Sequence, residues 1–242
     1  MTQAAATTSD TPSTPDMGLA ARIANVFFAP RSAFAAVAAR PRAFGVLAVC
    51  IITMMAAQFT FLSTEVGQTA ALNQQIDTMK AFGVTVTDEM VRQMESRMEY
   101  APFTGAAALL LYLPVMSAAV AGLLLAIFTV ITGGGGTFKQ VFAIVAHSLV
   151  IVALQAFFTF PIAYAREELV SPSLLSVFFP MLDDTGFLYH LLNTIDVFHI
   201  WWVISLSIGM AALYKRGTGG AAATLFGVYS VIVLIIAVVR TV

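Results

Sequence analysis

The sequence is poor in charged side chains. Only 10% of its 242 residues are charged, whereas 59% are hydrophobic, and the mean hydropathy is +0.88. A soluble domain of this length needs a charged surface, so this composition is that of a membrane protein. The net charge of −1 leaves no basic face that could bind the phosphates of a nucleic acid.

Cysteine and catalytic motifs are scarce as well. The single cysteine, Cys50, lies in an apolar run and cannot form a disulfide within the chain. No Ser/His/Asp, Cys/His or metalloprotease pattern occurs, so we expect no enzymatic activity, cofactor or metal site. The run Gly133–Gly136 lacks the GK[ST] ending of a phosphate-binding loop, and we interpret it as a flexible turn.

Long apolar runs are abundant instead. About 20 apolar residues cross a bilayer as a helix, and lipid forces the backbone of each run to form its hydrogen bonds internally. The sequence therefore predicts an all-α polytopic membrane protein with a five-helix transmembrane domain in residues 44–241. The predicted spans are 44–62, 103–132, 138–165, 194–214 and 219–239.

Charged residues divide between the two sides that these spans define. Seven of the twelve basic residues lie on the side of the N-terminus: Arg22, Arg31, Arg40, Arg42, Lys139, Lys215 and Arg216. The opposite side carries the loops 63–102 and 166–193 with most of the acids. By the positive-inside rule, we expect a cytoplasmic N-terminus and a periplasmic or extracellular C-terminus. The excess of arginine over lysine suggests a bacterial chain, and hence the bacterial inner membrane.

Two segments precede the first span. Residues 1–16 are small and polar, and we expect a cytoplasmic tail without regular structure. In residues 17–43 several apolar side chains share one helical face with Arg22 on its flank, and Pro30 interrupts the helix; the apolar residues are Leu19, Ile23, Val26 and Phe27. We predict an amphipathic segment in the membrane interface, with a helix packed on the cytoplasmic loops as the alternative.

The first outer loop contains a helix signal. Thr87 is suited to cap a helix in which Asp88 pairs with Arg92. The apolar side chains of this helix share one face: Met90, Val91, Met94 and Met98. We interpret that face as a packing surface, although thioethers can also bind copper(I).

Polar side chains at the outer end of the spans are candidates for a functional site. With Asn193 as N-cap, Asp196 falls at the third position of the fourth span and His199 lies one turn further on. A rise of about 1.5 Å per residue places Gln58 and Gln155 in the same layer. We expect these four polar residues to cluster, either as a hydrogen-bonded clasp or as the lining of a pathway for a proton, ion or solute.

His147 and the small residues complete the candidate positions. His147 lies near the middle of the third span, where we expect its ring to bond a neighbouring carbonyl. Small residues repeat every four positions on three spans, which favours close helix packing or a homo-oligomer; they are Gly219, Ala223 and Gly227, then Ala118 and Gly122, then Ser205 and Gly209. Pro114 and Pro161 are predicted to kink their spans.

The order of these features resembles the bacterial branch of the Yip1 family over about residues 18–240. The resemblance rests on VFFAPRSAFAAVAARPR before the first span, GGGGTFKQVF between the second and third, and DVFHIWWVISLSIGM in the fourth. It implies a five-span membrane protein of a family linked to vesicle traffic and membrane shape. Eukaryotic members face Rab-type GTPases, but the short tail of this chain does not match the GTPase-facing region.

Two functions follow as expectations. The first is a non-enzymatic membrane protein that organises or shapes the bilayer or scaffolds a partner, with lipids, a second copy or other membrane proteins as its partners. The alternative is a small proton, ion or solute carrier that uses Gln58, Gln155, Asp196 and His199.

Overall fold

The structure is a computed structural model that describes residues 17–169 and 186–241. Every regular element within these residues is a helix. Five of the described helices are long and apolar enough to cross a membrane: α3 (Phe44–Leu62), α6 (Ala101–Thr132), α7 (Phe138–Arg166), α10 (Val197–Tyr214) and α11 (Thr218–Thr241). The predicted all-α polytopic membrane fold is confirmed. Residues 1–16 and the middle of the second predicted outer loop, 170–185, lie outside the described residues.

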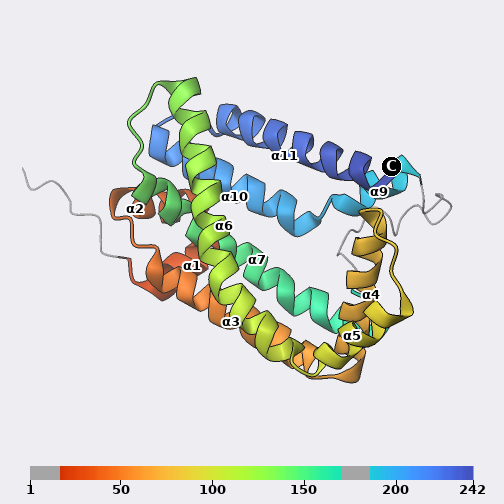
Figure 1. Ribbon diagram of the computed structural model, residues 1–242. Coiled ribbons are helices and arrows are strands. Elements are labelled where there is room, and N and C mark those ends of the chain that lie inside the picture. Colours follow the sequence, from red (N-terminus) through yellow and green to blue (C-terminus); the bar gives the residue numbers. More distant parts are fainter. Residues whose placement is uncertain (1–16, 170–185, 242) are drawn as a thin grey trace, which may run out of the picture.

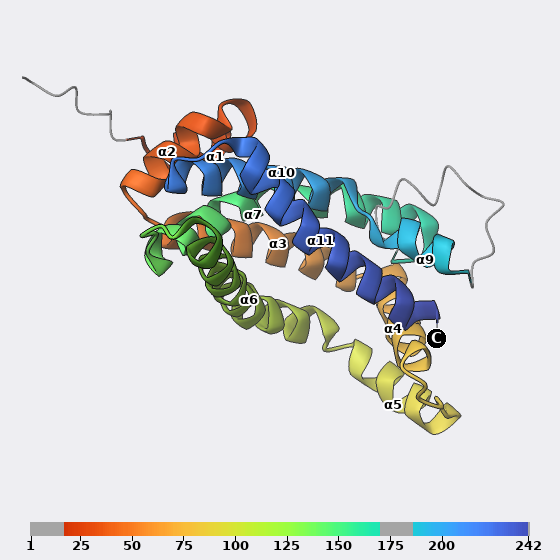
Figure 2. The same ribbon diagram turned by 90° about the horizontal axis from the view of Figure 1, so that it is seen from above.

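The spanning helices run between two ends of the bundle (Figures 1 and 2). We call one the basic end, because Lys139, Lys215 and Arg216 lie at the helix termini there. The opposite, acidic end carries three shorter helices: α4 (Glu65–Ala81), α5 (Asp88–Met98) and α9 (Phe187–Thr194). α7 packs against α3, α6 and α10 and contributes a buried stretch through the core, whereas α11 packs on α10 and α9.

The segment before the first span forms two helices that turn back on each other. The first, α1 (Leu19–Phe28), starts at the basic end, where Leu19 packs over Gly45 near the start of α3. The other end of α1 reaches far along the bundle, because the Phe27 ring meets the edge of Trp201 at a centroid distance of 5.6 Å. Trp201 lies about 20 Å along α10 from its basic end.

The second helix, α2 (Pro30–Ala39), returns to the basic end. Its first residue is a proline, which is pre-organised for the first turn of a helix. Phe34 is fully buried and lies against Gly209 of α10. At the basic end the Ala38 carbonyl accepts a hydrogen bond of 3.0 Å from Gln140 Nε2, near the start of α7.

These contacts make α1 and α2 a helical hairpin that packs along the bundle from its basic end. α1 packs against α7 and α3, and α2 packs against α7 and α10, while the predicted position of this segment in the membrane interface stays a prediction. The two helices pack in this way because each has an apolar stripe wide enough to need a protein partner. At the tip of the hairpin, Phe28 is 86% exposed.

The helices at the acidic end follow the predicted local chemistry with one change. Thr87 caps α5 by accepting a hydrogen bond of 3.3 Å from the Met90 amide, as expected. Arg92 pairs with Glu89 at 2.7 Å rather than with Asp88, since the i,i+3 spacing brings Glu89 onto its face. Hydrogen bonds from Arg92 and then Gln93 hold the pKa of Glu89 below its ordinary value.

Candidate functional site

Asp196 caps the fourth span. Its Oδ1 accepts hydrogen bonds from the amides of Phe198 at 2.7 Å and His199 at 3.3 Å. The sequence predicted the cap at Asn193 with Asp196 inside the helix. That position was wrong, because the backbone at Ile195 is extended and separates α9 from α10. The predicted capping role is correct, and it belongs to the N-cap position itself.

Gln155 and His199 gather around this carboxylate as predicted. Asp196 is only 2% exposed. Its Oδ2 accepts a hydrogen bond of 2.8 Å from Gln155 Nε2 on α7, and His199 Nδ1 lies 3.7 Å from Oδ1. The hydroxyl of Tyr229 on α11 also lies near the Asp196 backbone, without a hydrogen bond to any described residue. We call Gln155, Asp196 and His199 the acidic-end clasp.

A second bond joins the same two helices about two turns further into the bundle. Trp202 Nε1 donates to Ser148 Oγ at 2.9 Å, and that hydroxyl donates in turn to the Val145 carbonyl at 2.7 Å. The Ser148 hydroxyl thus accepts one hydrogen bond and donates another, and the indole N–H of Trp202 is paired as well. All of these polar groups are therefore satisfied inside the apolar core. The acidic half of the α7–α10 interface is thus fixed by two interhelical hydrogen bonds.

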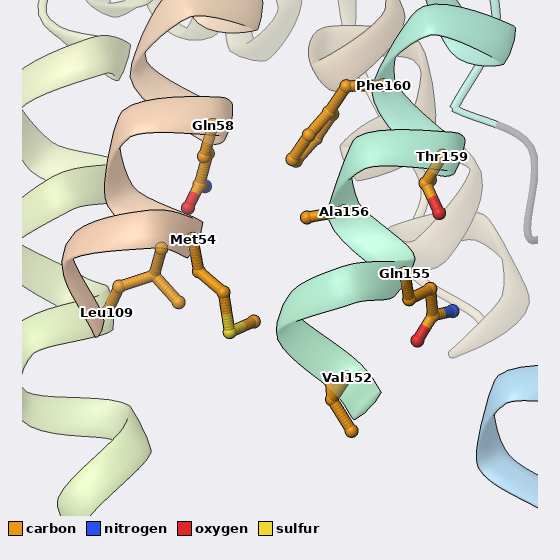
Figure 3. Close-up of a pocket in the computed structure, with 8 residues that line it drawn as sticks. All are labelled: Met54, Gln58, Leu109, Val152, Gln155, Ala156, Thr159 and Phe160. Atoms are coloured by element: carbon orange, nitrogen blue, oxygen red, sulfur yellow. The ribbon is translucent and has the colours of Figure 1, made fainter. Parts of the chain in front are cut away.

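Gln58 does not join the clasp. It lies on the other side of α7, across an open cavity of about 190 Å³ between α3, α6 and α7 (Figure 3). Figure 3 shows the Gln58 side chain directed into this cavity and the Gln155 amide turned away from it. The remaining lining is almost wholly apolar and comes from Met54, Leu109, Val152, Ala156, Thr159 and Phe160. A cavity with this lining suits an acyl chain better than an ion.

His147 lies apart from the clasp, deep in the core. It is fully buried, and its Nδ1 donates to the Ala143 carbonyl at 2.7 Å, which is the bond that the sequence predicted. Because a carbonyl only accepts, this bond fixes the proton of a neutral ring on Nδ1 and leaves Nε2 as an acceptor. Nε2 has no partner among the described residues.

The position of Arg22 differs from the one that the sequence predicted. Arg22 lies at the centre of the buried face of α1, and not on its flank, and is 8% exposed. Leu19, Arg22 and Val26 occupy positions i, i+3 and i+7, and this spacing could have revealed it. The Arg22 Nε has no hydrogen-bond partner in the part of the chain that the structure describes, and its charge lies near enough to the His147 ring to act on it electrostatically.

The three small-residue stripes have different surroundings. On α10, Gly209 allows Ile144 of α7 and Phe34 of α2 to pack directly on the backbone. On α11, Gly219, Ala223 and Gly227 are exposed, and no side chain covers the two glycines. On α6, Ala118 and Gly122 are half-buried, with open space above the glycine. The α10 stripe therefore serves packing within the chain, and the role of the other two stays a prediction.

Within the described residues, no group of three or more His, Cys, Asp or Glu side chains could hold a metal ion. The fold defines a polytopic α-helical membrane protein, and most of its buried polar side chains among the described residues lie on α1, α7 and α10. A model of the Yip1 domain matches residues 24–240, so the chain belongs to the Yip1 family. No curated protein and no solved structure matches it.

Proposed function

We propose that this Yip1-family protein organises or shapes a bacterial inner membrane without catalysing a reaction. The observation that supports this role best is the α1–α2 hairpin. It adds two helices to the bundle, both with an end at the basic side, whereas α4 and α5 at the acidic end are polar and carry little surface for lipid. A protein with a larger cross-section in one leaflet than in the other favours a curved bilayer.

The proposed orientation has the basic end in the cytoplasm. Arg40, Arg42, Lys139, Lys215 and Arg216 surround that end, and the described acids other than Asp196 lie in the acidic-end helices and loops. The positive-inside rule then assigns the C-terminus to the periplasm or exterior. In this orientation the hairpin occupies the cytoplasmic leaflet, and lipid, a second copy or another membrane protein covers the exposed faces of α6 and α11.

Reconstitution into vesicles tests this proposal. Wild-type protein is expected to narrow the vesicles as its density in the membrane rises, which electron cryomicroscopy measures directly. Phe28→Ser should weaken the narrowing, because it removes the aromatic ring from the exposed hairpin tip. Phe82→Ser is the matched control, since Phe82 is 72% exposed but lies between α4 and α5 at the acidic end. Equal vesicle diameters with and without wild-type protein would rule the proposal out.

The acidic-end clasp supports a second candidate, a small proton, ion or solute carrier. His199 has a side chain that is 44% exposed and lies 3.7 Å from a buried carboxylate, so the pair can exchange a proton with the outside. Proton uptake into vesicles should then fall when Gln155, Asp196 and His199 are all replaced by alanine. If a folded triple variant takes up protons as fast as the wild type, the carrier function is excluded. The acidic-end clasp would then have a structural role only.

A further inference from the structure

Three polar groups in the core have atoms that are buried and unpaired. Arg22 Nε on α1, His147 Nε2 on α7 and Ser205 Oγ on α10 make no hydrogen bond with any described residue. His147 and Ser205 each lie nine residues from the basic end of their helix, which corresponds to about 13 Å. The three groups therefore belong to the basic half of the bundle, where α1 packs against α7.

Arg22 is the charged member of this set and has no counter-ion among the described residues. No carboxylate of the described residues lies within ion-pair distance of its guanidinium, and the side chain is 8% exposed. An isolated charge inside a bilayer is costly and marks a functional site by default, since evolution otherwise replaces it with an apolar residue. Pairing with an anion from outside the protein would remove this cost.

Arg22 lies in the first turn of α1, close to the basic end of the bundle. Side chains on a helix lean toward its N-terminus, and α1 starts at the basic end, so this lean favours a guanidinium that faces that interface. Its Nε is buried and unpaired, whereas its terminal nitrogens, also unpaired with described residues, are not fully buried. A ligand that approaches along the interface meets these terminal nitrogens first.

We propose that Arg22 binds a phosphate group at the basic end of the bundle, with a membrane phospholipid or a free phosphate anion as its source. The planar guanidinium can donate two parallel hydrogen bonds to phosphate oxygens. His147 Nε2, an acceptor on the inner side, is complementary to the remaining Nε–H donor of Arg22. Leu19, with its side chain over Gly45, lines the adjoining apolar surface of α1 and α3.

This site is independent of the membrane-shaping role. The hairpin tip at Phe28 acts through its bulk, whereas the phosphate site acts through one charge near the start of α1. A protein that narrows vesicles without phosphate selectivity would leave the first proposal standing and overturn this one. Selective binding of phosphate by a protein that does not narrow vesicles would leave this proposal standing and overturn the membrane-shaping role.

Native mass spectrometry of the full-length protein tests the site. Phosphatidylglycerol adducts should exceed adducts of diacylglycerol, which lacks the phosphate group, by about tenfold in the wild type, because a charge-assisted pair contributes at least that factor. Arg22→Gln should abolish this preference, and Arg22→Lys should retain part of it. Arg97→Gln, which removes an exposed arginine of α5 at the acidic end, should leave the preference unchanged.

A second arm distinguishes the two sources of phosphate. In neutral detergent, inorganic phosphate should raise the unfolding temperature of the wild type but not of Arg22→Gln if a free anion binds. Stabilisation by phosphatidylglycerol alone would assign the site to a lipid headgroup. No lipid preference and no phosphate stabilisation in the wild type would overturn the proposal, a result that does not depend on whether Arg22→Gln folds. Equal lipid preference in the wild type and a folded Arg22→Gln would overturn it as well.

Discussion

The two halves of the α7–α10 interface are held together by different interactions. In the acidic half, Gln155 donates to Asp196 and Trp202 donates to Ser148, so polar groups of one helix satisfy those of the other. In the basic half, Gly209 lets Ile144 pack against the α10 backbone without any hydrogen bond between the two residues. His147 Nε2 and Ser205 Oγ, which lie one residue and three residues closer to the basic end than Ser148 and Trp202, are buried and have no hydrogen-bond partner among the described residues.

This difference separates structural polar groups from candidate functional ones. A buried polar group that serves the fold is hydrogen-bonded, since leaving it unpaired costs about 1–3 kcal/mol. The clasp around Asp196 meets this criterion. Arg22 Nε and His147 Nε2 do not meet it within the described residues, which makes these two atoms candidates for binding a ligand.

Removing the carboxylate of Asp196 should have the largest effect. Asp196→Ala deletes the N-cap of α10 and leaves the buried Gln155 amide without an acceptor, so we expect a loss of about 3 kcal/mol in the free energy of unfolding. Asp196→Asn retains an acceptor oxygen for the cap, so its free energy of unfolding should fall much less. Steric trapping in micelles measures the free energy of unfolding of both variants. A loss below 1 kcal/mol for Asp196→Ala would show that the clasp contributes little to the fold.

Filling the close contact at Gly209 should have the next largest effect. Gly209→Val places methyl groups where Ile144 and Phe34 already lie, and overpacking of this kind costs about 2 kcal/mol. Gly227→Val is the control, because nothing lies above that glycine within the chain. If the control is equally destabilised in a dilute monomeric preparation, close packing at Gly209 does not explain the result.

The sequence was informative about the fold because the signals are local. Apolar runs predicted the five spans, and α3 has the predicted bounds of 44–62. Thr87 was identified as a cap from its place before two acids. The start of the fourth span was misjudged at Asn193, because an apolar run continues across the break at Ile195 and hydropathy does not report backbone conformation.

The candidate site was less predictable because it depends on tertiary contacts. Depth along the helices correctly grouped Gln155, Asp196 and His199, but it could not say which side of α7 each side chain faces. Gln58 therefore entered the predicted cluster although it lies across the cavity. Arg22 was misplaced since a helix assumed to lie in the interface turns its charges to water, whereas α1 buries that face against α7.

Weakening the second polar bond of the acidic half should have a smaller effect. Trp202→Phe removes the indole donor to Ser148 and keeps most of the ring, so we expect a loss of about 1 kcal/mol. Ser148 still donates to the Val145 carbonyl in the variant, which limits the cost. Trp201→Phe is the control, because Trp201 packs on the Phe27 ring but makes no hydrogen bond with a described residue. Equal losses in both variants would indicate that ring volume, and not the hydrogen bond, is what stabilises this half.

Neutralising Arg22 should change the free energy of unfolding least, and it should raise this free energy whereas the other substitutions lower it. In neutral detergent, Arg22→Met removes an unpaired buried charge and keeps the length of the side chain, so the free energy of unfolding should rise by about 0.5 kcal/mol. Added phosphatidylglycerol should reverse this order, since only the wild type gains a phosphate partner. The measurement is the unfolding free energy of both proteins with and without this lipid. A destabilised Arg22→Met in neutral detergent would mean that Arg22 is satisfied within the chain, and the contrast between the two halves would then disappear.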